Sequence, residues 1–298
     1  MQTMLLIYNR HAGKDRNRLS LAEIVNTMTA QGYLVTMYPT QAPGDAGEAI
    51  TRWGSSYDRI VAIGGDGTLN EAVSGLLRLP EKPPLGYIPA GSTNDFSKNL
   101  SLPALPAEAA LVATGGVPRQ CDVGTFNGRP FIYVAAFGAF ADVSFNTPQR
   151  AKNLLGYAAY LLESVKRLPS IKPYQVTVEF DDQEISGSFL YGMVSNTTSV
   201  AGIQHFPLGD PKLDDGLLEV TLISPPKDIV ELERLGRILL LGDPQPTASP
   251  LVQTFSASKV TIHAQEDLLW ALDGENGGAH RTAEIGVIHH AFTIIHGA

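Results

Sequence analysis

The sequence predicts a two-domain α/β + β protein, in which a Rossmann-like parallel α/β domain precedes a mainly antiparallel β-sandwich domain. A chain of 298 residues is long for a single domain and suits two. The first third alternates strand and helix patterns, whereas strand patterns predominate after about residue 120. We place the first domain at residues 1–121 and the second at residues 122–285, and we leave open whether the tail at about 286–298 returns to the first domain.

The elements of the first domain alternate along the chain. Apolar runs predict strands, and apolar residues at helical spacing predict helices. The expected strands are residues 4–8, 33–38, 60–63 and 85–88, and the expected helices are residues 19–31, 44–52, 69–77 and 107–114. Ligands bind such sheets at the carboxyl ends of the strands. The candidates there are Asn9, Thr40, Asp66 and Thr93.

The second domain is expected to be rich in strands, and a barrel is the alternative to a sandwich. A hairpin is predicted around the turn Asn127-Gly128, because this dipeptide favours tight turns. Helices are expected at residues 149–168 and 229–241. Further strands are expected at residues 174–180, 185–195, 217–223, 259–264 and 268–272.

Composition excludes several classes of protein. Apolar residues make up 44% of the chain and charged residues 17%, as in globular proteins. The single cysteine, Cys121, excludes an internal disulfide framework and favours a reducing compartment. We find no signal peptide and no apolar run of the roughly 18 residues that a membrane span requires. A net charge of −8 argues against nucleic acid as a partner, and we expect a cytoplasmic protein.

The most informative segment is residues 60–77, where an apolar strand, a glycine-rich turn and a helix follow one another. Glycines let a backbone approach phosphate closely, and a helix N-terminus offers N–H groups to an anion. Asp66 lies inside this turn and would repel phosphate unless a cation stood between them, so the segment predicts a nucleotide site with Mg²⁺. The GxxxxGK[ST] pattern of an ordinary P-loop is absent from the sequence.

A second loop, YIPAGSTNDF, follows the next strand and carries Ser92, Thr93, Asn94 and Asp95. Its polar groups can donate to phosphate or hold metal-bound water. Alone, this loop would be interpreted as a plain turn.

Together, GGDGTLNEA and GSTNDF resemble the diacylglycerol kinase catalytic domain of soluble bacterial lipid kinases. The resemblance continues along the chain in the segments IYNRHAGK, CDVG, FPLGDPKLDDGLLEV and LDGEN. Arg10 stands where this family often has proline, and the loop PLGD replaces a Pro-x-Ala pattern. Motifs that recur in the same order are more specific than any one of them.

The resemblance implies that the first domain binds ATP through loop residues. These residues are Asn9, Arg10, His11, Ala12, Gly13, Thr40, Gly65, Asp66, Gly67, Thr68, Leu69, Asn70, Glu71 and Thr93. A catalytic Mg²⁺ is expected to be surrounded, through water, by Asp66, Asp95 and Asp122.

In the second domain, the resemblance implies a structural Mg²⁺. It would be bound by the carboxylate of Asp215 and by the backbone carbonyls of Lys212 and Leu217, a set of hard oxygen ligands. The resemblance also assigns the catalytic base to Glu275, with Asp273 close by and left open as the alternative. His289 and His290 lie in an apolar strand and are expected to be structural.

The implied reaction is transfer of the γ-phosphoryl group of ATP to a lipid alcohol, with diacylglycerol as the favoured acceptor and phosphatidic acid as the product. Because the substrate lies in a bilayer, we expect transient contact with the inner face of the membrane. Basic residues at 14, 16, 18, 166 and 167 are the candidate docking face. Two alternatives are a kinase of dinucleotides, because NAD kinases also carry GGDGT, and a non-catalytic nucleotide-binding regulator. A homodimer is left open.

Overall fold

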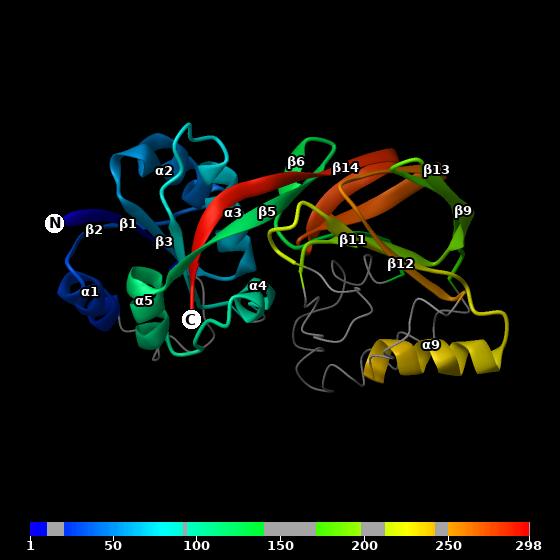
Figure 1. Ribbon diagram of the computed structural model, residues 1–298, viewed down its shortest axis with the longest axis horizontal. Coiled ribbons are helices and arrows are strands. Elements are labelled where there is room, and N and C mark those ends of the chain that lie inside the picture. Colours follow the sequence, from blue (N-terminus) through cyan, green and yellow to red (C-terminus); the bar gives the residue numbers. More distant parts are fainter. Residues whose placement is uncertain (11–20, 92–93, 140–170, 198–211, 242–249, 298) are drawn as a thin grey trace. The chain divides into compact units, whose positions relative to one another are not determined.

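Figure 1 shows the computed structural model of the protein, which describes residues 1–10, 21–91, 94–139, 171–197, 212–241 and 250–297. The chain divides into two compact units. Unit 1 contains Met1–Asp122 and His289–Ala298, and unit 2 contains Val123–Ile288. Unit 1 is built on parallel strands and unit 2 on antiparallel strands, which confirms the predicted fold class.

The sheet of unit 1 has the strand order β4-β3-β1-β2, and the end of β14 adds beside β4 in parallel. The bounds of these strands are β1 Gln2–Tyr8, β2 Tyr33–Pro39, β3 Arg59–Gly64, β4 Leu85–Pro89 and β14 Glu275–His296. Strand β4 is buried along its whole length, and β3 is buried from its second residue onward. Continuous apolar runs of this kind are typical of parallel strands that are covered by helices on both faces.

Helices pack on both sides of this sheet (Figure 1). Their bounds are α1 Leu21–Ala30, α2 Asp45–Trp53, α3 Asp66–Leu76, α4 Asp95–Asn99 and α5 Pro106–Gly115, with a short 3₁₀ turn, η1, at Gly54–Ser56. Helices α1 and α5 share one apolar core with the sheet. Helices α2 and α3 approach each other at Gly47 and Gly75, where a Cβ on Gly75 would lie 2.6 Å from the Gly47 carbonyl oxygen.

Unit 2 consists of antiparallel strands in the order β12-β11-β10-β7-β13-β14, with β8 and β9 joined to β13 and with β5 and β6 joined to β14. The bounds are β5 Val117–Phe126, β6 Arg129–Phe131, β7 Val134–Gly138, β8 Tyr174–Phe180, β9 Gln183–Phe189, β10 Tyr191–Ser195, β11 Leu218–Ile223, β12 Val252–Ala257 and β13 Lys259–Leu272. Among the described residues of this unit, helix α9 spans Ile229–Leu241.

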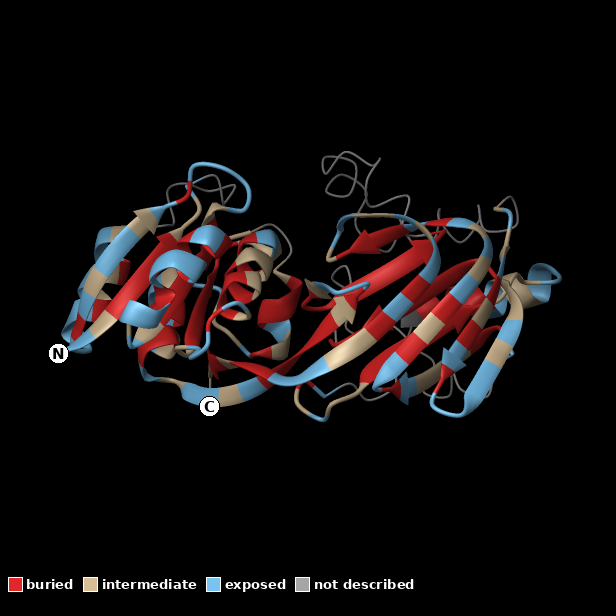
Figure 2. Cartoon of the chain, turned by 90° about the horizontal axis from the view of Figure 1, so that it is seen from above, coloured by how far each residue is buried: buried red, intermediate tan, exposed pale blue. Residues whose placement is uncertain are grey.

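The core of unit 2 is aromatic and β-branched. Trp270 is fully buried and packs against Phe126 and Phe137, with ring centroids 4.8 and 5.0 Å apart. Figure 2 shows buried and exposed residues alternating along the strands, as expected where one face of a sheet is covered. No helix in the described part of the chain is long and apolar enough to cross a membrane.

Two strand predictions for unit 2 were wrong. The expected strand at residues 185–195 is divided at Leu190 into β9 and β10, because β9 pairs with β8 whereas β10 pairs with β7 and β11. The expected strands at 259–264 and 268–272 are one strand, β13, whose register shifts between His263 and Leu268.

The predicted Asn127-Gly128 hairpin is confirmed, with φ angles of 47° and 80°. The helix expected at 149–168 lies outside the described residues.

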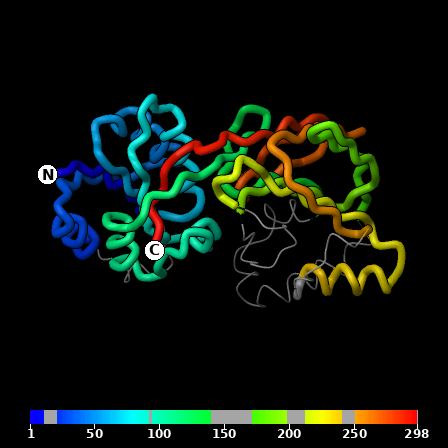
Figure 3. Tube along the Cα trace, in the orientation of Figure 1, coloured from blue at the N-terminus to red at the C-terminus, as the bar shows by residue number. Residues whose placement is uncertain are grey.

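The chain passes between the two units in β5 and again in β14 (Figure 3). These two strands pair with each other although they are far apart in sequence. Residues at the end of unit 1 in β5 are therefore brought beside residues near the C-terminus.

Candidate functional site

The glycine-rich turn connects β3 directly to α3. Gly65 precedes the helix in an extended conformation, and the helix begins at Asp66. A Cβ on Gly64 would lie 2.3 Å from Oγ1 of Thr68, so this position requires glycine. The first N–H groups of a helix have no partner within the helix, and they carry the positive end of its dipole. The turn therefore presents an anion site at the carboxyl edge of the sheet.

The second polar loop lies directly against the first. A Cβ on Gly91 would approach the Cα of Gly65 to 2.5 Å, so the two loops touch through their glycines. Asn94, which has a φ of 49°, closes the second loop by accepting a bond from the Gly91 N–H (2.8 Å) and donating to the Gly91 carbonyl (3.0 Å). The two loops thus form one surface.

Tyr87 supports the first glycine loop through a hydrogen bond, although the sequence analysis did not identify it as a candidate. Its ring is fully buried in β4, and its hydroxyl donates to the carbonyl of Gly64 at 3.1 Å. Burial, with a further contribution from Asp66, raises the pKa of Tyr87 well above its usual value, so the hydroxyl keeps its proton. A buried tyrosine needs a partner for its hydroxyl. That requirement was the available signal in the strand LGYIP.

Asp66 and Asp95 lie together between the two loops. The carboxylate of Asp66 accepts the N–H groups of Asp95 (3.2 Å) and Phe96 (3.3 Å), while the buried Asp95 pairs with Lys98 at 3.0 Å. Burial, and then the neighbouring Asp95, raise the pKa of Asp66 above its ordinary value. A divalent cation would offset both effects, because it neutralises clustered carboxylate charge. The pair therefore fits a hard cation such as Mg²⁺.

Asn9 and Thr40 lie at the same edge of the sheet. The side chain of Asn9 donates to Oγ1 of Thr68 at 3.0 Å, and the Thr40 N–H donates to the carbonyl of Tyr8 at 3.0 Å. Three expected ATP contacts, Asn9, Thr40 and Thr68, therefore follow β1, β2 and β3 in turn. The remaining expected residues in this part of the chain are Arg10, which follows Asn9, and Gly67, Leu69 and Asn70, which belong to α3.

Glu71 has a structural contact of its own. Its two carboxylate oxygens accept the N–H groups of Gly44 (2.8 Å) and Ala46 (3.2 Å) at the start of α2. A carboxylate at this position caps the helix and complements its dipole. Other expected residues lie outside the described part of the chain: they are His11, Ala12, Gly13 and Thr93, together with the basic residues at 14, 16, 18, 166 and 167.

In unit 2, Asp273 lies in the turn between β13 and β14, whereas Glu275 is the first residue of β14, and their surroundings differ. The carboxylate of Asp273 accepts three backbone N–H groups, from Ile132 (2.8 Å), Tyr133 (3.0 Å) and Val134 (2.9 Å). Glu275 has a side chain that is 68% exposed and pairs with Arg129 at 3.5 Å. Asp273 is thus held by the backbone that leads into β7, whereas Glu275 faces solvent.

Asp215 lies in a turn before β11. Its Oδ1 accepts the N–H of Leu217 at 3.1 Å, and Gly216 between them has a φ of 74°. Lys212 precedes the same turn. One carboxylate and two backbone carbonyls within six residues form a donor set that fits a hard cation.

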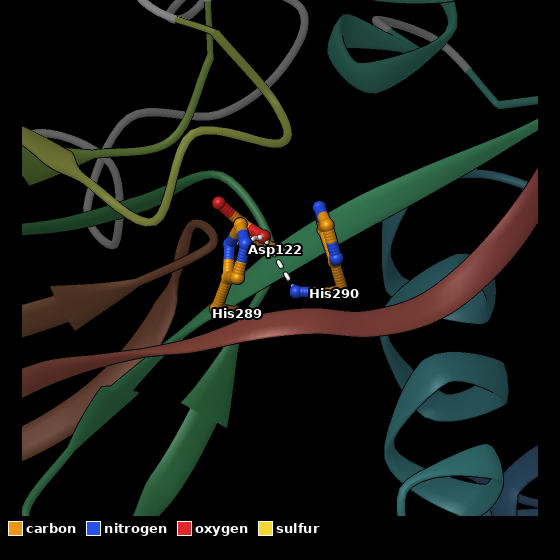
Figure 4. Close-up of side chains that lie close together, drawn as sticks. All are labelled: Asp122, His289 and His290. Atoms are coloured by element: carbon orange, nitrogen blue, oxygen red, sulfur yellow. Dashed lines mark hydrogen bonds and ion pairs between the residues drawn. The ribbon is translucent and has the colours of Figure 1, made fainter.

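Asp122, which the resemblance assigns to the catalytic Mg²⁺, lies in β5 and contacts two histidines of β14. Figure 4 shows the three side chains together. Oδ1 of the buried Asp122 is 3.0 Å from Nδ1 of His289 and accepts the backbone N–H of His290 at 2.7 Å. No local pattern predicts this cluster, because Asp122 lies 167 residues from His289 in the chain.

Comparison with known proteins matches both units. Residues 3–126 match the family described as the diacylglycerol kinase catalytic domain, and residues 134–296 match the YegS C-terminal NAD kinase beta sandwich-like domain. A diacylglycerol kinase of Staphylococcus saprophyticus is 34% identical over 92% of this chain and 88% of the relative. A diacylglycerol kinase of Bacillus subtilis is 31% identical over 99% of this chain and 97% of the relative. The crystal structure of a diacylglycerol kinase from Bacillus anthracis str. Sterne superposes with a TM-score of 0.80, at 25% identity, and the match covers 99% of this chain and 97% of that one.

Proposed function

Because this chain belongs to the diacylglycerol kinase family of lipid kinases, we propose that it transfers the γ-phosphoryl group of ATP to the hydroxyl of a lipid alcohol in a Mg²⁺-dependent reaction. The observation that carries the proposal is the pair of touching glycine loops with Asp66 and Asp95 between them. Such a surface supplies N–H donors for phosphate and carboxylates for a cation.

Phosphoryl transfer requires mainly positioning and neutralisation of charge. The α3 N-terminus and the loop closed by Asn94 would hold the phosphates, and Asn9 and Thr68 would line the same edge. Asp66 and Asp95 would hold Mg²⁺ through water. When bound, the ion would neutralise phosphate charge.

We propose Glu275 as the base that accepts the proton of the attacking hydroxyl. Both oxygens of Asp273 accept backbone N–H groups, so this carboxylate is fixed in place. Glu275 is exposed, and its ion pair with Arg129 is 3.5 Å long. A substrate hydroxyl could therefore replace Arg129 as the partner of this carboxylate. Asp273 would then position the segment from which Glu275 acts.

Diacylglycerol is the acceptor that the names of the relatives favour, and its product would be phosphatidic acid. One observation supports a second candidate. The family matched by residues 134–296 is described as NAD kinase beta sandwich-like, which keeps a dinucleotide kinase as the alternative. A lipid acceptor would require transient contact with a membrane surface, whereas a dinucleotide would not.

The deciding experiment is a phosphoryl-transfer assay with ATP and Mg²⁺. The acceptors are diacylglycerol in vesicles, other lipid alcohols in the same vesicles, and NAD in solution. We expect lipid phosphorylation that is lost when Mg²⁺ is chelated. Phosphorylation of NAD alone would replace the proposal by its alternative, and turnover of none of the acceptors would favour a nucleotide-binding regulator.

A further inference from the structure

A second group of possible metal ligands lies where β5 and β14 run side by side. Asp122, His289 and His290 each offer one ligand atom, and these atoms lie within 4.8 Å of one another. All three residues belong to unit 1. The side chain of Asp122 is completely buried, whereas that of His289 is 49% exposed. The cluster therefore combines a buried carboxylate with the imidazoles of two exposed residues, and Figure 4 shows the three side chains together.

We propose that these three residues bind a divalent transition-metal ion such as Zn²⁺ or Co²⁺. Nitrogen and oxygen ligands lie about 2.1 Å from Zn²⁺, so two ligands of one ion are at most about 4.2 Å apart. Oδ1 of Asp122 and Nδ1 of His289 are already 3.0 Å apart, a separation that suits two neighbouring ligands. The ion would replace the hydrogen bond between them, with the imidazole proton carried on Nε2. A small rotation of the exposed His290 ring would complete the set.

The backbone of His290 brings both imidazoles to the same side. Successive side chains of a regular strand point to opposite faces. Here His290 has a φ of 49°, and its ring stacks on that of His289 with centroids 3.7 Å apart and an angle of 28°. A left-handed conformation is disfavoured for a residue with a side chain, and such conformations are common at functional sites.

The ligand types select the class of metal. Imidazole nitrogen suits Zn²⁺, Co²⁺, Ni²⁺ and Cu²⁺, whereas Mg²⁺ and Ca²⁺ prefer oxygen. Two imidazoles and one carboxylate therefore differ in kind from the oxygen-only Mg²⁺ arrangement of Asp66 and Asp95, where the family resemblance also expects Asp122; the contacts of Asp122 with the two histidines assign it here to the second set. Three protein ligands would leave the fourth position of the ion to water or to another small ligand.

Hydrogen bonding alone is the competing explanation. The two donors to Oδ1 satisfy the buried Asp122, and His289 could serve only this purpose. The two explanations differ in what the His290 ring does. It is required for metal binding, whereas only the backbone N–H of this residue bonds to Asp122.

The test is Co²⁺ binding to the full chain, followed by absorption spectroscopy after removal of bound metals and in excess Mg²⁺. We expect one equivalent of Co²⁺ to bind. His290→Asn is the decisive variant, since asparagine tolerates the left-handed conformation better than most residues. His289→Gln retains a side chain that can donate to Asp122. Each variant should weaken binding at least about 10-fold.

The matched control is His263→Ala. His263 is 45% exposed and lies 3.2 Å from the hydroxyl of Thr282, outside the cluster. Its removal should leave the affinity for Co²⁺ unchanged. Absence of Co²⁺ binding by the unaltered chain would overturn the proposal, as would equal affinity in His290→Asn. Loss of binding in His263→Ala instead would place the site elsewhere.

Discussion

Asp66 in unit 1 and Asp273 in unit 2 are both aspartates in tight turns next to glycine, but their surroundings differ. Asp66 accepts two backbone N–H groups at 3.2 and 3.3 Å and lies beside a second carboxylate, Asp95. Asp273 accepts three N–H groups at 2.8–3.0 Å. A carboxylate whose charge is incompletely compensated is suited to bind a cation, whereas one that is fully hydrogen-bonded stabilises the fold.

The largest expected effect is that of Asp66→Ala. Turnover should fall by at least about 10²–10³-fold, the usual loss when one electrostatic contribution to a transition state is removed. Mg²⁺ should raise the midpoint of thermal unfolding of the unaltered chain more than that of the variant, which keeps the candidate cation site at Asp215. Asp58→Ala is the control, because Asp58 bonds to Thr3 before the amino end of β3. Unchanged turnover in Asp66→Ala would contradict the proposed role.

Glu275→Gln should lower kcat by about 10²–10⁴-fold, since it removes the base while keeping the shape of the side chain. The KM for ATP should change little, and so should stability. Glu266→Gln is the matched control, because Glu266 is an exposed glutamate paired with Lys172 at 2.9 Å. Steady-state kinetics would check both variants. A normal kcat in Glu275→Gln would place the base elsewhere.

Asp273→Asn should act mainly on stability. The amide is uncharged and has one acceptor oxygen, so all three N–H groups would lose a charged acceptor and at least one would lose its acceptor altogether, at a cost of at least about 1.5–3 kcal/mol. Urea unfolding would measure the loss. If kcat fell as in Glu275→Gln while the free energy of unfolding stayed unchanged, Asp273 and not Glu275 would be the base.

Tyr87→Phe should have a smaller effect. It removes the bond from the hydroxyl to the Gly64 carbonyl, which contributes about 1 kcal/mol to stability. We expect a slightly lower unfolding midpoint and a higher KM for ATP with kcat nearly unchanged, because the glycine turn would be less well fixed. An unchanged KM would show that Tyr87 supports the fold only.

The smallest effect concerns pH. The pKa of Asp66 is raised in the folded chain, so between its ordinary value of 3.8 and that raised value the folded state binds more protons than the unfolded state. The stability of the metal-free chain should therefore decrease as pH rises through this window. Urea unfolding in the presence of a chelator, measured at several pH values, should show that the free energy of unfolding falls less steeply with pH in Asp66→Asn than in the unaltered chain. Equal slopes in the two proteins would contradict the raised pKa.

Local patterns in the sequence determined the elements and the first loop. The glycine turn after β3, helix α9 and the Asn127-Gly128 hairpin each depend on residues that are close together in the chain. Periodicity and turn chemistry are local properties, so one sequence is enough to predict them. The prediction of a phosphate-binding turn with Asp66 came from the same local pattern.

Only the tertiary structure decided which distant groups meet. Residues 185–195 form two strands and not one, because the two halves of this segment pair with different neighbouring strands. The carboxylate of Asp273 accepts hydrogen bonds from three N–H groups about 140 residues away in the chain, and Asp122 contacts His289, which is 167 residues away. Contacts at such separations depend on the folded sheet and leave no periodic signal in the chain. The sequence therefore predicted which residues carry the chemistry, and the fold decided which carboxylate is held by the backbone and which remains exposed.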